Sequence, residues 1–171
     1  PSGDIDILVH PSKLLESKKI LCDHGGFSQI QEIAEQDLLS DHYHLIFRKN
    51  NILLEVHWNL VKRYFSIPAD FWWQESKKFE WNGINAIELS VEKYIIYNIF
   101  RLFDHCFYPL RFFILLSGII NQNADKINWG RLIRFARRYK MEKLVVLTLR
   151  LFLDMFHTRI PENIVQKRYP G

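Results

Sequence analysis

The sequence has little cysteine and no long hydrophobic run, and both absences narrow the class of protein. Its 171 residues include two cysteines, Cys22 and Cys106, and neither belongs to a CxxC pair. This usage argues against a disulfide framework and against a zinc knuckle. The longest uncharged apolar segment, residues 112–124, is shorter than the roughly 20 residues of a membrane-spanning helix. We therefore expect a protein of the reducing cytoplasm with no membrane partner.

Neither sign of charge dominates the chain. It carries 23 Lys and Arg against 19 Asp and Glu, for a formal net charge of +4. This mild basic excess suits an anionic ligand such as a nucleotide, and it is too small to indicate nucleic acid. A hydrophobic fraction of 48% is that of a folded protein. The length allows one domain or two small packed ones.

The first apolar run, residues 4–9, carries two acidic residues one position apart. Residues i and i+2 share a face of an extended strand, so Asp4 and Asp6 project together, roughly 6 to 7 Å apart. Ile5 and Ile7 then face a core. Two carboxylates that close repel each other unless a cation lies between them. The pattern indicates either a divalent metal site or a solvated strand edge whose charges discourage further pairing.

A second strand with an acidic residue is predicted within a hairpin over residues 42–48 and 52–58, joined by a short turn that contains asparagine. Glu55 and His57 share one face of its second strand. If this strand lies beside the first, Asp4, Asp6 and Glu55 form an oxygen-rich site of the kind that Mg²⁺ takes. We expect His57 to pack or hydrogen-bond near the site rather than to act as a base.

The remaining pattern places strands before helices, which is typical of α+β proteins. We predict a small mixed sheet in a first domain, residues 1–89, followed by an α-helical domain, residues 90–171. Ser12, Ser90 and Asn128 are predicted helix N-caps. The expected elements are a helix over 13–21, a short helical piece within 28–40, an irregular connection over 64–73, a hairpin over 79–81 and 84–89, and helices over 91–107, 110–120, 129–139 and 142–156.

Four features occur together in one order along almost the whole chain. They are the Asp4-Ile5-Asp6-Ile7-Leu8-Val9 strand, the Leu54-Glu55-Val56-His57-Trp58 strand, the Trp129-containing helix after a polar loop, and the closing Ile160-Pro161-Glu162.

With these features the chain resembles the nucleotidyltransferase superfamily, and within it the bacterial family of uncharacterised nucleotidyltransferases. The resemblance implies a transferase that moves a nucleoside monophosphate from an NTP to an acceptor on Mg²⁺ or Mn²⁺. It assigns Asp4, Asp6 and Glu55 as the catalytic, metal-binding residues. Neither the acceptor, the type of NTP nor the oligomeric state is named by any motif.

The family normally places a Gly-Ser turn, which opens a triphosphate-binding helix, about ten residues or more before the first Asp. Here only residues 1–3 precede Asp4. We therefore expect a nucleotidyltransferase-like domain that lacks its first strand and this turn, and with them the main anchor for the triphosphate. This departure favours the alternative function of a non-catalytic interaction module or antitoxin-like partner that retains the fold.

Two further groups of charged residues have competing interpretations. Arg131, Arg134 and Arg138 share one face of a predicted helix, either as a basic wall for phosphate or nucleic acid or as an ordinary solvated face. Arg101 and His105 invite comparison with the Arg and His pair of a HEPN-type ribonuclease. Their spacing is one residue shorter than that family uses, and the alternative is that the two side chains interact with each other or with Asp104.

Overall fold

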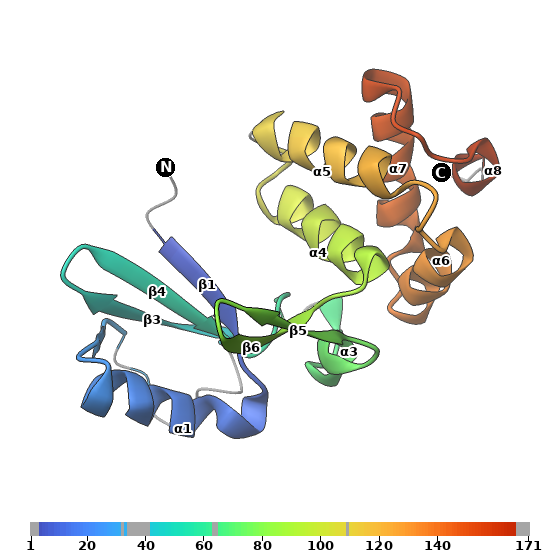
Figure 1. Ribbon diagram of the computed structural model, residues 1–171. Coiled ribbons are helices and arrows are strands. Elements are labelled where there is room, and N and C mark those ends of the chain that lie inside the picture. Colours follow the sequence, from blue (N-terminus) through green and yellow to red (C-terminus); the bar gives the residue numbers. More distant parts are fainter. Residues whose placement is uncertain (1–3, 32, 34–41, 63–64, 109, 167–171) are drawn as a thin grey trace. The chain divides into compact units, whose positions relative to one another are not determined.

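The chain folds into two compact units, residues 1–74 and residues 75–171, whose elements are labelled in Figure 1. The computed structural model describes residues 4–31, 33, 42–62, 65–108 and 110–166. The boundary at Gln74 comes earlier than residue 90, where the sequence analysis places the start of a helical domain, and the second hairpin belongs with the helices.

The first unit contains a four-stranded mixed sheet, which together with the helices confirms the α+β class. Its strands are β1 (Asp4–Leu8), β2 (Ser28–Gln29), β3 (His44–Lys49) and β4 (Ile52–His57), in the order β1-β4-β3-β2. β1 runs parallel to β4, and the other two pairs are antiparallel. β4 therefore lies between the strand that carries Asp4 and Asp6 and its own hairpin partner.

The predicted hairpin is present and its short turn fixes the register. Lys49 pairs with Ile52, which leaves Asn50 and Asn51 as the turn. Asn50 has a φ of 52°, a left-handed conformation that asparagine adopts more readily than most residues. A one-residue slip would move every side chain to the opposite face, so this turn decides which side chains of β4 reach the core.

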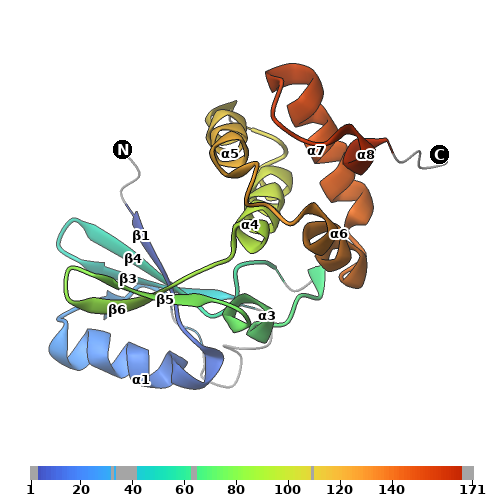
Figure 2. The same cartoon turned by 45° about the vertical axis from the view of Figure 1, so that its right-hand side comes forward.

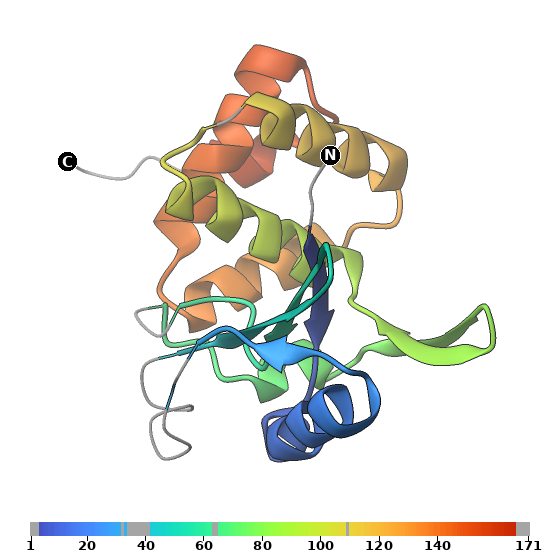
Figure 3. The ribbon, with the colours of Figure 1, turned by 90° about the vertical axis from the view of Figure 1, so that its left-hand side faces the viewer.

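One face of the sheet is apolar and is covered by the helix that follows β1. Alternate residues of β3 and β4 are buried with Leu14, the first residue of α1 (Leu14–Lys19). Figures 2 and 3 show α1 lying along this face. The buried strand residues are Leu45, Phe47, Leu54 and Val56, with Trp58 just beyond β4. The opposite face is left for the polar side chains.

Two predictions for the segment after β1 need correction. Ser12 does not cap α1 with its side chain, because the chain first makes a 3₁₀ turn, η1 (Pro11–Lys13), with His10 at its N-cap. Ser28 and Gln29 form strand β2 instead of the beginning of a helical piece, because their backbone pairs with β3. Residues 32 and 34–40 of that predicted piece lie outside the described residues.

The second half of the chain follows the predicted succession of hairpin and helices closely. α4 ends at Asp104 rather than near Phe107, because Cys106 and Phe107 take left-handed φ values of 51° and 57°. A short helix also occurs within the predicted irregular connection, at the end of the first unit. The elements are α3 (Asp70–Trp73), β5 (Lys77–Trp81), β6 (Ile84–Glu88), α4 (Val91–Asp104), α5 (Leu110–Asn123), α6 (Trp129–Arg138), α7 (Glu142–Phe156) and α8 (Glu162–Val165).

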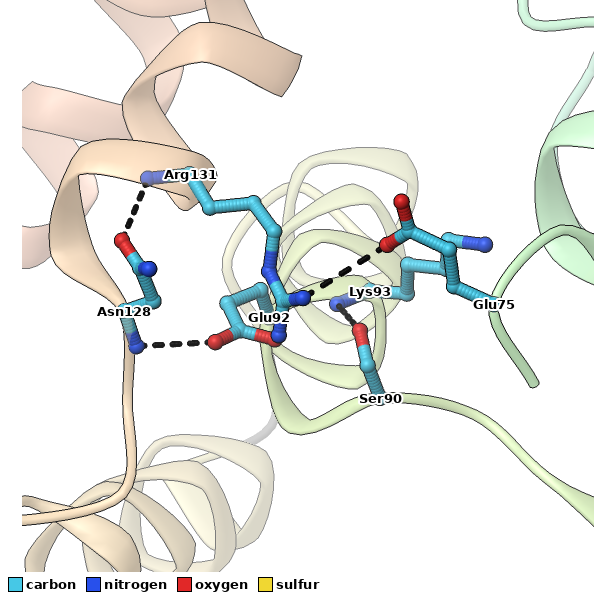
Figure 4. A network of polar contacts seen from close by, with 6 residues as sticks. All are labelled: Glu75, Ser90, Glu92, Lys93, Asn128 and Arg131. Atoms are coloured by element: carbon cyan, nitrogen blue, oxygen red, sulfur yellow. Dashed lines mark hydrogen bonds and ion pairs between the residues drawn. The ribbon is translucent and has the colours of Figure 1, made fainter. Parts of the chain in front are cut away.

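The starts of α4 and α6 are joined by a polar network inside the second unit (Figure 4). Ser90 and Asn128 cap the two helices as predicted, accepting hydrogen bonds from the backbone N–H groups of Lys93 and Arg131. The Glu92 carboxylate accepts from the Asn128 backbone N–H at 2.8 Å and from Arg131 Nη2 at 2.6 Å. This buried carboxylate therefore binds α6 to α4 through two donors.

In the parts of the chain that the structure describes, every helix falls short of the length and apolar character required to cross a bilayer.

Candidate metal centre

The polar face of the sheet brings together acidic side chains from β1 and β4. Asp6 pairs with Glu55, and Asp4 pairs with Leu53, in the parallel ladder. Side chains of directly paired residues point to the same face of a sheet. Asp4, Asp6 and Glu55 therefore share the face opposite the apolar core, as the sequence predicts for strands that lie side by side.

His57 lies between the two paired carboxylates. Its Nε2 atom is 3.3 Å from Asp6 Oδ1 and 3.3 Å from Glu55 Oε2. Asp6, Glu55 and His57 each offer a ligand atom, and these atoms lie within 4.8 Å of one another. Asp4 is on the same face two residues earlier in β1 and is not a member of this close group. The cluster thus consists of two carboxylates with one imidazole between them.

β3 supplies a second imidazole beside the cluster. His44 pairs with His57 in the antiparallel ladder, and the two rings stack with centroids 5.2 Å apart. The Tyr43 ring lies 5.8 Å from the His57 ring. These rings shield the His57 side chain, which is only 11% exposed. The His57 ring is therefore covered by the rings of His44 and Tyr43, while the Asp6 side chain remains about half exposed.

The surroundings of Glu55, His57 and His44 shift the pKa of each of these side chains. Burial, with the charges of Asp6 and Asp4, raises the pKa of Glu55, and the nearby His57 only partly offsets this. Burial lowers the pKa of His57 against the opposing influence of Asp6, and it lowers the pKa of His44 as well. The carboxylates of Asp6 and Glu55 therefore lie close together, and His57 only partly offsets their mutual repulsion. A bound cation is most favourable under this condition.

The hydrogen-bonding state of His57 indicates which atoms suit a metal. Its Nδ1 atom is buried without a hydrogen-bond partner in the described part of the chain. A proton on that nitrogen would lose a hydrogen bond, so the proton belongs on Nε2, where two carboxylates accept it. The donors left for a cation are carboxylate oxygens, which fit a hard divalent ion such as Mg²⁺ or Mn²⁺.

Among the basic residues singled out in the sequence, Arg131 makes internal ion pairs, and so does its neighbour on α6, Arg137. Arg131 pairs with Glu92, and Arg137 pairs with Glu142 at 2.8 Å. The Arg131 guanidinium also lies 3.5 Å from Glu75. Two of the four arginines of α6 are thus held by carboxylates of the same unit, whereas Arg134 and Arg138 are exposed, as on an ordinary solvated face.

The comparison of Arg101 and His105 with a ribonuclease pair gains no support. The Arg101 guanidinium lies over the Phe112 ring at 5.0 Å and the Tyr97 ring at 5.7 Å. The His105 ring lies 5.5 Å from the same Phe112 ring. Both side chains are therefore arranged around an aromatic surface.

His57 hydrogen-bonds near the site, as the sequence predicts, and the structure adds that it lies between the two carboxylates. Its spacing of two from Glu55 was the available signal, because it puts both side chains on one face. The parallel register that sets Asp6 opposite Glu55 could not be read from that spacing.

Comparison with known protein families identifies the family of this chain. Residues 1–157 match the model of a family described as uncharacterised nucleotidyltransferase. No curated protein and no solved structure matches the chain. The matched region includes both strands of the acidic face and most of the helical unit. The chain belongs to the family of uncharacterised nucleotidyltransferases.

Proposed function

We propose that this protein transfers a nucleoside monophosphate from an NTP to a hydroxyl acceptor, and that Asp4, Asp6 and Glu55 hold the divalent metal for the reaction. The observation that carries the proposal is the pairing of Asp6 with Glu55 on one polar face, where their oxygens and a ring nitrogen of His57, whose pKa is lowered, lie within 4.8 Å of one another. Family membership supports the class of reaction.

The residues have separate roles in this proposal. Asp6 and Glu55 bind the cation, and Asp4, on the same face of β1, extends the site toward a second position. A Mg²⁺ or Mn²⁺ ion, when bound, activates the acceptor hydroxyl and offsets phosphate charge. His57 donates its Nε2 proton to the carboxylates and holds their separation. The cytoplasm, where Mg²⁺ and NTPs are plentiful, is the proposed location.

Metal titration tests the site. We expect Mn²⁺, followed by its electron paramagnetic resonance signal, to bind the wild-type protein, and NTP to bind more tightly with Mn²⁺ than without it. Asp6→Asn and Glu55→Gln should each weaken Mn²⁺ binding by about tenfold or more. Asp23→Asn is the matched control, because Asp23 is an exposed carboxylate of the same unit outside the cluster.

Equal Mn²⁺ affinity in the wild type, Asp6→Asn and Asp23→Asn would contradict the proposed metal site. In that case the alternative from the sequence, a non-catalytic interaction module with the same fold, would become the better account.

A further inference from the structure

A second cluster of chemically active side chains lies in the turn that follows β1. His10 Nδ1 is 2.8 Å from Ser12 Oγ, and His10 Nε2 is 3.3 Å from Asp70 Oδ1. Ser12 and His10 belong to the turn before α1, whereas Asp70 is the first residue of α3. A nucleophile, a base and a carboxylate that orients the base are thus joined from segments 60 residues apart.

The hydrogen bonds define where the protons lie. The Ser12 backbone N–H donates to His10 Nδ1 at 3.3 Å, and an N–H can only donate. Nδ1 therefore carries a lone pair, and the ring proton is on Nε2, where it faces the Asp70 carboxylate. In the contact between Ser12 Oγ and Nδ1 the hydroxyl must then be the donor. Its proton already points at a basic nitrogen.

This arrangement meets the requirements for an activated hydroxyl. A serine becomes nucleophilic when a general base lies within hydrogen-bonding reach and a third group orients that base. The Trp73 ring, with its centroid 5.8 Å from that of His10, further limits the imidazole. Ser12 is exposed, and the His10 side chain is 43% exposed. An electrophile can therefore reach the serine oxygen.

The position in the chain connects this serine with the acidic face. Val9 alone separates β1 from His10, and the Val9 backbone N–H still donates to the His57 carbonyl at 2.8 Å. The strand that carries Asp4 and Asp6 thus leads directly into the turn, at the end of β4 where His57 lies. Ser12 and the candidate metal centre belong to the same compact unit.

We propose that Ser12 is an acceptor of the nucleotidyl group, so that the protein modifies its own chain; the proposal rests on the proposed function. Ser12 Oγ attacks the α-phosphorus of the NTP and forms a P–O bond. The bond from that phosphorus to the bridging oxygen of the β-phosphate breaks, and pyrophosphate leaves with the electron pair. The hydroxyl proton passes to His10 Nδ1 and then to water. Asp70 is a positioning residue, since it acts through His10.

The first experiment measures the modification. Wild-type protein is incubated with Mn²⁺ and each NTP in turn, and intact-mass and peptide mass spectrometry follow the addition of one nucleoside monophosphate. We expect the adduct on Ser12, none in Ser12→Ala, and a rate about 100-fold lower in His10→Gln. Ser28→Ala should equal the wild type, because Ser28 is another exposed serine of the same unit.

The second experiment needs neither NTP nor metal. A fluorophosphonate probe should label Ser12 in the wild type and in Ser28→Ala, and labelling should be lost in Ser12→Ala. In nitrogen-15 NMR the His10 ring should show the Nε2–H tautomer that the Ser12 backbone N–H selects. Probe labelling of Ser12 should be slower in Asp70→Ala and restored in Asp70→Glu, and equal labelling in the wild type and Asp70→Ala would remove Asp70 from the positioning role.

The metal titration and the adduct measurement together distinguish the Ser12 proposal from the proposed function. Mn²⁺-dependent NTP binding that Asp6→Asn weakens, without a Ser12 adduct, would overturn the Ser12 proposal and leave the proposed function standing. An adduct on another residue would do the same. A protein that binds neither Mn²⁺ nor NTP would overturn the proposed function, and with it the modification of Ser12.

Discussion

Glu55 and Glu92 are the same residue type in surroundings of opposite character. The Glu55 side chain, in the sheet unit, is 22% exposed and faces Asp6 and a histidine. The Glu92 side chain, in the helical unit, is fully buried and contacts a guanidinium and a backbone N–H. Burial alone would raise the pKa of both carboxyls. Hydrogen bonds from Asn128 and Arg131 instead hold the pKa of Glu92 below its usual range.

The difference indicates which carboxylate is structural. Glu92 has its counter-charge within the fold, so its charge is satisfied without any ligand. The pKa of Glu55 is raised by burial and by its acidic neighbours, so the folded chain holds that charge at a cost in stability. A partly buried carboxylate whose contacts do not offset the effect of its burial is the kind of feature that marks a functional site.

Breaking the satisfied pair should give the largest effect. Arg131→Ala leaves the Glu92 carboxylate buried without its guanidinium, and we expect a loss of about 3 kcal/mol in unfolding free energy. Urea denaturation followed by far-ultraviolet circular dichroism measures it. Arg150→Ala is the control, because Arg150 pairs with Asp154 on an exposed helix surface and should cost under about 0.5 kcal/mol. Equal losses in the two variants would contradict the structural role of Glu92.

A bound divalent cation should offset the negative charge beside Glu55 and so stabilise the folded sheet unit. Mn²⁺ at 100 times its dissociation constant should raise the unfolding free energy of the wild type by about 2.7 kcal/mol. Glu55→Gln should show little of this gain, since one of the paired oxygens no longer carries charge. Thermal unfolding over a series of Mn²⁺ concentrations gives the measurement. A gain of the same size in Glu55→Gln would remove Glu55 from the ion-binding set.

The N-cap of α6 should contribute less. Asn128→Ala removes the side-chain oxygen that accepts from the Arg131 backbone N–H at 2.9 Å, at an expected cost of about 1 kcal/mol. The Asn128 backbone N–H that donates to Glu92 stays in place. Ser90→Ala should cost less than Asn128→Ala, because the Ser90 contact at the start of α4 is longer, at 3.4 Å. The same urea series decides the order, and the reverse order would contradict it.

The smallest expected effect is a difference in pH dependence without metal. Folding raises the pKa of Glu55 above its ordinary 4.5, so the folded chain binds the proton more strongly than the unfolded chain. The stability linked to Glu55 is then full below pH 4.5 and is lost as the pH rises through the raised pKa. Glu55→Gln removes this loss, so the variant should gain on the wild type as pH increases above 4.5.

For Glu92 the sign is opposite. Its pKa lies below the ordinary 4.5 in the folded chain, so its contribution is full above pH 4.5 and is lost as the pH falls through the lowered value. Acid titration of Glu92→Gln against the wild type, in the absence of metal, should therefore show the stability difference between them shrinking toward low pH. A difference that instead shrinks toward high pH would contradict the assignment.

Local patterns sufficed for the hairpins, for most of the helices and for the faces of β4, whereas Ile5 and Ile7 of β1, which were expected to face a core, are 53% and 36% exposed. Alternation along residues 42–48 and 52–58 predicted the hairpin and the side of the sheet that Glu55 occupies. Capping residues predicted the starts of α4 and α6, because a side-chain oxygen that accepts from the first turn is a local property of the chain. The pairing of Ser28–Gln29 with β3 overrode a helical pattern that rested on few apolar positions.

Contacts between residues far apart in the sequence could not be predicted from local sequence patterns. The bridging position of His57 depends on the parallel register of β1 with β4. The contact of His10 with Asp70 depends on where α3 packs. Ser12 was predicted as a helix cap because its neighbours in sequence suggest nothing else. The chemistry of both clusters arises from partners that only the tertiary structure supplies.

The parallel pairing of β1 with β4 has a consequence for how the chain folds. The β3–β4 hairpin closes through a two-residue turn, and such hairpins form in about 1–10 μs. β1 must instead pair with a strand that is distant in the sequence, as Asp6 does with Glu55, so its docking follows at a greater entropic cost. That late step also forces the carboxylates together. Docking of β1 against this repulsion should therefore limit the refolding rate, and a divalent ion should accelerate it.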